Sequence, residues 1–500
     1  MIQGVRKVIE DVFVLDEEKA EEAIVSGEEV EIYDSAYGWN DDLVNWLRQA
    51  GFWDILTSIE PDVKKQNGIR SSVLNGIWAI MDIAHIGKIQ KVDPVLRDGR
   101  IMHEVGFNIH RVQARLKEGR AVVHRDTLRN HIKRMSVREA GAAFYRHVVH
   151  MRRKKLMRGK VYAADGFDIE VTCPDSYEGC GKKWDPDKGE WVYGYKVEIL
   201  FNLADDRPRI IGIALGPINT DERELLLDIL SSLSANVAPV NQIIDTLVLD
   251  RGYWGVGFFK QLCEKYRIHI VTPARADLSA CEDVRALVKL EGRSPVVRHV
   301  RKENNKGKIV AYLREMTPVQ NVEVVGEHGD VLKMNAVFMR EIKGSTGEVS
   351  EVIYFTTLPV ARVPQRVVDH YDLRWNIENR CNRTLSQTWK MRTLVARKLN
   401  AIFAQLVMVA MCYNACRIYQ EKNPKEAEET RIKMQERGIN SFLVYHGTIV
   451  FVPRLRVFAT MDSVRCADLA AKRAAVQLLS LTRQGMSLEE AIEKTVGKVE

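Results

Sequence analysis

The chain has 500 residues, which is too long for one ordinary hydrophobic core, so we expect two to four structural units. With 46% hydrophobic and 28% charged residues, its composition is that of a globular protein and excludes collagen-like or wholly disordered chains. The N-terminal residues lack the apolar core of a signal peptide, and the most apolar stretch, 401–416, is too short to span a bilayer. We therefore expect a soluble protein of the cytoplasm.

The net charge of +7 is unevenly distributed along the chain. Residues 1–35 hold eleven acidic side chains against three basic ones, which favours an acidic, solvated arm. Residues 131–160 reverse this balance, with ten basic side chains and a single acid. Four consecutive cations of this segment form what we call the basic cluster: Arg152, Arg153, Lys154 and Lys155. Such a cluster would attract a phosphate backbone, although a solvated helix face explains the charge equally well.

Apolar residues return every three or four positions between about Asp41 and Met151, which predicts a helical region. Near its end, residues 123–135 are typical of a short basic helix with Asp126 as its N-cap. If this is the second helix of a helix-turn-helix, Arg129 and Lys133 are candidates to contact DNA. An exposed basic helix without a role in DNA binding is the simpler alternative.

The pattern changes to strands at Val161. Residues 161–169, 191–203 and 209–215 are rich in apolar, β-branched and aromatic side chains, with a turn at 205–208. A helix opens after Thr220, and two further strands, 243–249 and 268–271, flank a helix at about 256–266. Three antiparallel strands followed by alternating helix and strand indicate a mixed α/β sheet.

The second half of the chain does not continue this alternation. Residues 276–358 contain repeated turn signals between strand-like runs and predict a β-rich insertion. From Pro364 to about Glu421 the pattern is helical again. Beyond 425, only a short strand near 448–452 and a helix near 467–482 are predicted.

Two acids stand at positions where a carboxylate is unusual. Asp165 interrupts an apolar strand, where an unpaired charge is costly. Asp250 ends a buried strand and opens into a glycine-containing loop, a favoured place for a functional side chain in α/β sheets. A structural ion pair or an ordinary turn would explain either acid alone.

A third acid belongs to a polar stripe on a helix. Tyr371, Arg374 and Glu378 follow each other at spacings of three and four, so they share one helix face. An ordinary Arg–Glu pair on a solvated face is the simple alternative. However, nine basic and three acidic side chains lie between positions 362 and 398, which suits a site that holds both metal and phosphate.

The ordered set of motifs resembles the insertion-sequence DDE transposases, in the branch whose third motif reads Tyr-(2)-Arg-(3)-Glu-(6)-Lys. The likeness lies in Ala164-Asp165-Gly166, Gly194-Tyr195-Lys196, Leu249-Asp250-Arg251-Gly252-Tyr253, and the run from Tyr371 to Glu378. A long β-rich insertion between the second and third acids is similar to that family as well. The resemblance covers about residues 161–420.

This resemblance implies an RNase H-like catalytic domain that holds two Mg²⁺ or Mn²⁺ ions on Asp165, Asp250 and Glu378. Water would attack the phosphodiester at the transposon end, and the freed 3′-hydroxyl would attack target DNA. Tyr371 and Arg374 would contact DNA phosphates, and the motif cations Lys196 and Arg251 join the candidates for DNA binding. A homodimer or larger synaptic complex and association with the nucleoid are implied too.

The fold class we expect is therefore α/β, an RNase H-like mixed sheet with helical regions before and after it. In chain order the parts are an acidic N-terminal arm (1–40), a helical DNA-binding domain (41–158), the catalytic domain's first part (159–275), the β-rich insertion (276–358), the catalytic domain's second part (359–424) and a C-terminal region (425–500).

Two departures from the family pattern bear on mechanism. The family's final lysine falls at Leu385, and Lys390 is the nearest lysine that could replace it. The insertion has no tryptophan on which a flipped base could stack; its aromatic side chains are Tyr312, Phe338, Tyr354 and Phe355. Three alternatives stay open: a transposase-derived DNA-binding protein without activity, an RNase H-like nuclease without strand transfer, and a helical interaction protein.

Overall fold

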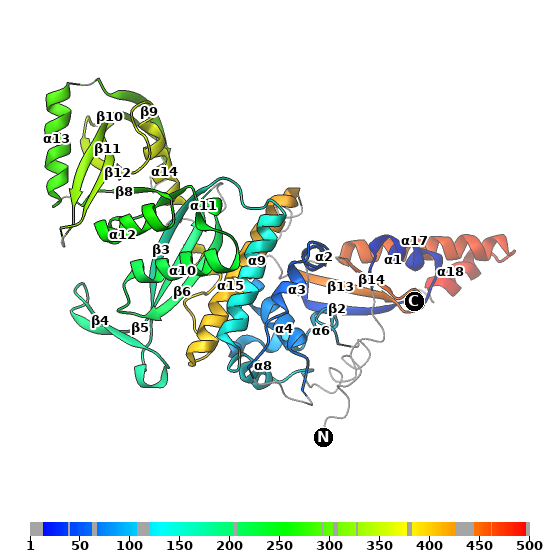
Figure 1. Cartoon of the computed structure of the whole chain (residues 1–500). Helices are drawn as coiled ribbons and strands as arrows, with labels where there is room; N and C mark the ends of the chain where they lie inside the picture. Colours follow the sequence, from blue (N-terminus) through cyan, green and yellow to red (C-terminus); the bar gives the residue numbers. More distant parts are fainter. Residues whose placement is uncertain are drawn as a thin grey trace. The chain divides into compact units, whose positions relative to one another are not determined.

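The computed structural model describes residues 14–38, 41–62, 68–107, 121–203, 208–275, 277–292, 294–303, 309–326, 329–377, 383–425, 428, 445–461 and 463–496. The chain forms two compact units, which are described separately below (Figure 1). Unit 1 combines residues 1–144 with residues 388–500, and unit 2 comprises residues 145–387.

Unit 1 contains a helical core. Its helices are α2 (Asp41–Gln49), α3 (Phe52–Leu56), α4 (Ser71–Ile83), α5 (Asp93–Leu96), α6 (Gly99–Glu104), α8 (Arg125–Ile132), the first part of α9 (Val137–Arg153) and α15 (Leu399–Lys422), with a 3-10 turn at Ile89–Lys91. Figure 1 shows α15 beside α3 and α4. Large apolar side chains such as Phe52 and Trp78 are fully buried there, as the three-to-four spacing of apolar residues predicts.

Helix α15 is longer than the apolar run that the sequence suggests. The run 401–416 lies inside the 24-residue helix Leu399–Lys422, which continues past both ends of the run. By length and composition α15 is the one helix of the described chain that could cross a membrane, but 83% of its most apolar window is buried in the protein. Its apolar character is therefore used in the core.

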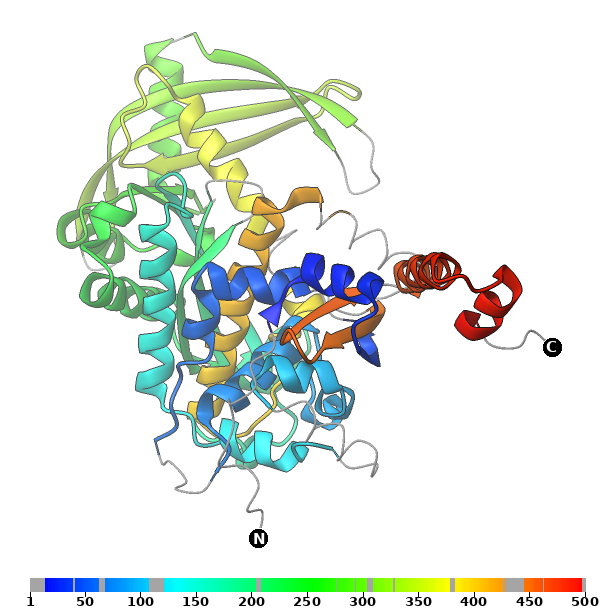
Figure 2. The ribbon, with the colours of Figure 1, turned by 90° about the vertical axis from the view of Figure 1, so that its right-hand side faces the viewer.

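Unit 1 also contains a four-stranded sheet in the order β1 (Val14–Leu15), β14 (Val457–Met461), β13 (Tyr445–Val452) and β2 (Glu31–Gly38). Helix α1 (Glu17–Ser26) lies beside these strands in Figure 2, and α17 (Ser463–Arg483) and α18 (Leu488–Val496) follow them in the chain. Ala20, Ala23 and Ile24 pack against Val450 and Leu469.

The expectation of a solvated arm over residues 1–40 is therefore wrong for residues 14–38. The apolar positions of α1 recur every three or four residues between its acids, and they form one buried face. The count of acidic side chains hid this face, because exposed acids outnumber the few small apolar residues that hold the helix in place. Residues 1–13 lie outside the described residues.

Unit 2 is built on one ten-stranded mixed sheet. Its order is β4 (Gly181–Asp185), β5 (Glu190–Asn202), β3 (Val161–Glu170), β7 (Thr246–Val248), β8 (His269–Pro273), β12 (Val349–Thr356), β11 (Val331–Lys343), β10 (Ile309–Val325) and β9 (Val296–Glu303), and β6 (Arg209–Pro217) also pairs with β5. Strands β3, β7 and β8 are parallel, and the other pairs are antiparallel. The predicted mixed α/β sheet is confirmed.

The helices of unit 2 follow the predicted alternation with some differences. They are the second part of α9, α10 (Glu222–Asn236), α11 (Val240–Ile243), α12 (Val256–Lys260), α13 (Ser279–Glu291) and α14 (Gln365–Asn376), with a 3-10 turn at Pro174–Ser176 and π-helical turns at Gln261–Lys265 and Thr384–Thr388. Asp221 caps α10 through the backbone nitrogen of Arg223. The insertion begins with helix α13, which the sequence did not indicate, and then forms β9 to β12.

The two units divide the chain at 144/145 and 387/388, whereas the sequence suggested divisions at 158/159 and 424/425. One difference arises because α9 is a single helix that runs through the first division. The other arises because α15 packs with α2, α3 and α4, far earlier in the chain. Periodicity reveals that such a helix exists but not which distant helices it joins.

A buried histidine links two helices of unit 1. His131 of α8 donates from Nε2 to Oδ1 of Asn75 at 2.9 Å, and the amide nitrogen of Asn75 donates to the carbonyl oxygens of Thr57 and Ile59. Burial lowers the pKa of His131 to about 4; Glu60 opposes this shift and Arg134 adds to it. The imidazole is therefore neutral at pH 7.

Because folding lowers the pKa of His131 from 6.5 to about 4, the unfolded chain holds the extra proton more tightly. Stability should fall as pH drops below 6.5, with a contribution from this group of about 2 kcal/mol between pH 7.5 and 5. Urea unfolding at the two pH values measures the change. His131→Gln keeps a side-chain amide but cannot titrate, so its loss of stability should be smaller; an equal loss would remove this role from His131.

Candidate active site

The pairing of two parallel strands determines where the first two predicted acids lie. Strand β3 pairs with β7 through Val161↔Thr246, Tyr162↔Leu247 and Ala163↔Val248. Asp165 and Asp250 each lie two residues beyond the last of these pairs, so the register directs both acids toward the same level and face of the sheet. Neighbouring strands are about 4.8 Å apart, so we expect these two positions to lie close together.

Helix α14 supplies two side chains to Asp250. The hydroxyl of Tyr371 lies 3.5 Å from Oδ1 of Asp250, and Nη2 of Arg374 lies 3.7 Å from the same oxygen. The guanidinium of Arg374 also stacks over the ring of Tyr371, 5.2 Å from its centre. The sequence prediction that Tyr371 and Arg374 share a helix face agrees with this geometry, since both reach one carboxylate.

These contacts occur in a partly buried setting. The side chain of Asp250 is 43% exposed, whereas that of Arg374 is only 6% exposed. Burial raises the pKa of the Tyr371 hydroxyl, and the nearby charge of Arg374 partly opposes the shift. Arg251, the residue after Asp250, is exposed and stands beside the site. The arrangement is one partly exposed carboxylate in contact with a phenol and a guanidinium group.

The third predicted acid, Glu378, lies outside the described residues. Within the described part of the chain, no group of three His, Cys, Asp or Glu side chains is arranged to hold a metal ion. Leu385, where the family has its lysine, is fully buried in the π-helical turn Thr384–Thr388. Lys390 is exposed and belongs to unit 1, where it adjoins Gly87.

A buried acid that the sequence did not single out lies on the other face of β3. Glu198 of β5 pairs with Gly166, is fully buried, and accepts a 2.6 Å hydrogen bond from the Tyr253 hydroxyl. Burial raises the pKa of Glu198 well above its ordinary value; the bond from Tyr253 opposes the shift, and the charges of Glu222 and Asp165 add to it. An acid inside the apolar run 197–201 was the available signal, the same signal that marked Asp165.

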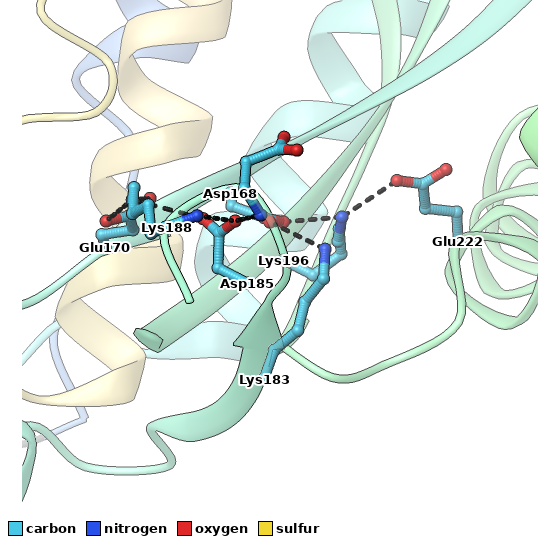
Figure 3. A network of polar contacts seen from close by, with 8 residues as sticks. Asp168, Glu170, Lys183, Asp185, Lys188, Lys196 and Glu222 are labelled. Atoms are coloured by element: carbon cyan, nitrogen blue, oxygen red, sulfur yellow. Dashed lines mark hydrogen bonds and ion pairs between the residues drawn. The ribbon is translucent and has the colours of Figure 1, made fainter. Parts of the chain in front are cut away.

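Lys196 lies on that face too, within a network of ion pairs (Figure 3). Its ammonium is 2.6 Å from Asp168 and 2.9 Å from Glu222, and its side chain is 9% exposed. Burial works against the charged ammonium, but the two carboxylates outweigh it and the pKa of Lys196 is raised. The expected DNA contact of Lys196 is thus not supported, because the cation is enclosed by its own carboxylates.

The cations predicted to bind DNA elsewhere differ in their exposure. All four side chains of the basic cluster are exposed at the end of α9 and just beyond it. Arg129 is ion-paired with Asp126 in α8, whereas the side chain of Lys133 is exposed.

Asp126 is not the N-cap as predicted: His124 caps α8 by accepting from the backbone nitrogen of Asp126. Residues 108–120 lie outside the described residues, so the predicted helix-turn-helix is not tested.

Three of the four aromatic side chains of the insertion are poorly placed for stacking on bases, and the fourth, Tyr312, is half-buried. Phe338, Tyr354 and Phe355 are buried, and Tyr354 packs against Tyr371 with ring centres 5.0 Å apart. In the described part of unit 2, large exposed rings occur instead on the β4–β5 ribbon. Trp184 and Trp191 pair across it with ring centres 5.6 Å apart, and they are 48% and 52% exposed.

Helix α14 is held on the insertion strands by a buried cation. Arg314 of β10 contacts Glu341 of β11 at 2.7 Å and Asp372 of α14 at 2.5 Å, and its side chain is 3% exposed. Burial alone would lower the pKa of Arg314, but the two carboxylates raise it above its ordinary value. Because Asp372 is adjacent to Tyr371, this ion triad helps to fix the position of the helix that contacts Asp250.

Replacing Arg314 by alanine should lower the free energy of unfolding by about 3 kcal/mol, because two carboxylates lose their buried cation. The loss should not be larger, because the Asp372 side chain is 36% exposed and solvent can stabilise its charge. Arg340→Ala is a matched control in the same sheet, because Arg340 is 43% exposed and pairs with Glu315 at the surface. It should cost less than about 1 kcal/mol. Denaturant unfolding compares the two variants, and equal losses would contradict the proposed anchoring of α14.

The comparison with protein families agrees with this geometry. A family model described as "Transposase DDE domain" matches residues 157–415, just over half of the chain and including Asp165, Asp250 and helix α14. No curated protein matches the chain. The family generally uses divalent metal ions and acts on DNA. The protein belongs to the DDE transposases.

Proposed function

We propose that the protein is an active DNA transposase. In this proposal unit 2 carries an RNase H-like catalytic domain that cuts the phosphodiester at transposon ends and joins the freed 3′-hydroxyl to target DNA. The observation that supports the proposal is the parallel register of β3 with β7, since Asp165 and Asp250 each follow its last pair by two residues. The family match supports the transposase class but not these chemical steps.

The donor atoms suit the metal ions that this chemistry uses. Asp165 and Asp250 offer hard carboxylate oxygens, and both side chains are partly exposed. We assign the two carboxylates, together with Glu378, to the binding of Mg²⁺ or Mn²⁺, with two ions in the site. When bound, such ions activate the attacking oxygen and stabilise the leaving one. The fit rests on the two described carboxylates, since Glu378 lies outside the described residues.

The surrounding side chains position the carboxylate and the substrate. Tyr371 and Arg374 contact Oδ1 of Asp250 and therefore orient it. The exposed Arg251 also brings permanent positive charge to the place where a DNA phosphate would lie, and guanidinium groups bind phosphate oxygens in pairs. Arg374, which is largely buried, adds its charge beside Asp250. We assign the exposed basic cluster to the DNA backbone farther from the cut. A homodimer or larger complex would be needed to bring two transposon ends together.

Replacement of either aspartate by asparagine should abolish cleavage of DNA that carries the transposon ends. We expect a loss of at least about a hundredfold for Asp165→Asn and Asp250→Asn, because an amide is a poor ligand for a hard cation. Glu378→Gln tests the third proposed ligand in the same way. Asp228→Asn, an exposed acid on α10, is the control and should cut normally. DNA binding, measured in parallel by fluorescence anisotropy, should be nearly unchanged in all four variants.

If the three site variants cut as well as the control, the assignment of the site is wrong. A gel assay for joined target products separates the two candidate activities. Cleaved ends without joined products would instead indicate an RNase H-like nuclease.

Neutralising the basic cluster tests its role in DNA binding. The quadruple alanine variant should reduce the steepness of the plot of log binding constant for DNA against log salt concentration by roughly 3 to 4, since each phosphate contact contributes about 0.9. Alanine substitution of Arg285 and Lys289, two exposed cations of α13, serves as control and should leave the slope near its original value. A slope that does not change in the quadruple variant would exclude the cluster from the DNA-binding surface.

A further inference from the structure

A buried hydrogen bond connects β5, the strand that pairs with β3 beside Asp165, to the turn that follows Asp250. The hydroxyl of Tyr253 donates to Oε1 of Glu198 at 2.6 Å. Glu198 is fully buried and Tyr253 is 1% exposed. The other carboxyl oxygen of Glu198, Oε2, has no hydrogen-bond partner among the residues that the structure describes. Tyr253 is therefore the neighbour that holds the Glu198 side chain in one orientation.

Glu198 occupies the space over Gly166, the residue next to Asp165. Gly166 pairs with Glu198 across β3 and β5. A Cβ atom at position 166 would lie 2.8 Å from Oε2 of Glu198 and 3.0 Å from Oε1 of Glu222. The first separation is shorter than real contacts of a Cβ atom and the second is unusually tight, so glycine at this position leaves room for the Glu198 carboxyl. Glu198 thus packs directly on the backbone that carries Asp165.

Tyr253 has a similar relation to Asp250. It ends the short 3-10 turn Arg251–Tyr253, and its backbone nitrogen donates to the carbonyl oxygen of Asp250 at 3.2 Å. The turn leaves the sheet just after the β3–β7 ladder has ended, so strand pairing no longer fixes it. The hydroxyl bond to Glu198 supplies a second attachment at this point.

We infer that Glu198 and Tyr253 are positioning residues for the metal site, and that their hydrogen bond sets the spacing of the Asp165 and Asp250 carboxylates from the opposite face of β3. This inference rests on the proposed function, because it takes these two aspartates as metal ligands. Glu198 fixes the β3 side of the site, and Tyr253 fixes the turn after Asp250. Both side chains are buried, so we assign them no direct contact with metal or DNA and expect them to act through the two aspartates.

The test compares variants that remove or retain the hydrogen bond in the full-length chain. Tyr253→Phe removes the hydroxyl, and Glu198→Leu removes the acceptor. Glu198→Gln keeps an oxygen that accepts from Tyr253. Tyr266→Phe is the matched control, since the hydroxyl of Tyr266 is buried and has no hydrogen-bond partner in the described part of the chain.

Mn²⁺ binding to the protein, followed by electron paramagnetic resonance of the free ion, gives a readout that does not depend on cleavage. Outer side chains that orient metal ligands commonly change affinity by 10- to 100-fold. We expect Tyr253→Phe and Glu198→Leu to raise the half-saturating Mn²⁺ concentration by about tenfold. Glu198→Gln should stay within about twofold of the original protein, and Tyr266→Phe should not differ from it. The double variant Tyr253→Phe/Glu198→Leu should be no weaker than either single variant, because both remove the same bond.

Asp165→Asn separates the failure of this inference from the failure of the proposed function. If Asp165→Asn binds Mn²⁺ as the original protein does, the proposed metal site is wrong and the inference falls with it. If Asp165→Asn loses Mn²⁺ but Tyr253→Phe retains full affinity, the inference alone is overturned. If Glu198→Leu fails to fold, the comparison of Tyr253→Phe with Glu198→Gln decides the test. Only Tyr253→Phe removes the hydrogen bond, so an equal loss of Mn²⁺ affinity in both variants would also overturn the inference.

Discussion

The parallel pairing of β3 with β7 is the constraint on which the candidate site depends. Parallel neighbours bring residues at the same register to the same level and face, so two positions 85 residues apart in sequence become adjacent. Asp165 still lies within its strand, whereas Asp250 lies just past the end of its own. The sheet therefore holds Asp165 directly, whereas side chains outside the ladder must hold the turn at Asp250.

Those side chains approach from two directions. On the face that carries the aspartates, α14 brings Tyr371 and Arg374 to Asp250, and Arg314 holds α14 on the insertion strands. On the opposite face, the Glu198–Tyr253 hydrogen bond holds the turn after Asp250 against β5. Unit 2 thus uses its insertion as a support for the helix that contacts the site. Mobility of this helix and metal affinity should consequently be linked.

The sequence predicted the strands around the site well because they are short, apolar and bounded by clear turn signals. Asp165 stood out as an acid in an apolar run, and Glu198 carries the same signal but was missed. The free-energy cost of burying a charge marks such an acid as unusual, but it does not tell which distant hydroxyl forms a hydrogen bond with it. The partner, Tyr253, lies 55 residues farther along the chain.

Other features were beyond the reach of local patterns. Lys196 matched a family motif, but only the folded chain shows that Asp168 and Glu222 enclose it. Helix α1 was hidden by its acids, and its packing depends on strands more than 400 residues away in sequence. In both cases the contacts that matter join residues far apart in the sequence. The composition of a segment is dominated by its many exposed side chains and does not reveal the few that pack in the core. The spacing of residues within one helix, as for Tyr371 and Arg374, predicted the observed arrangement most directly.

The most direct test of the central claim is to locate Mn²⁺ in crystals of the protein by anomalous scattering. We expect a peak between the carboxylates of Asp165 and Asp250, with metal–oxygen distances of roughly 2.0–2.2 Å to both side chains. A peak that contacts neither aspartate, or only one of them with the other more than about 6 Å away, would contradict the claim that these two acids form one metal site.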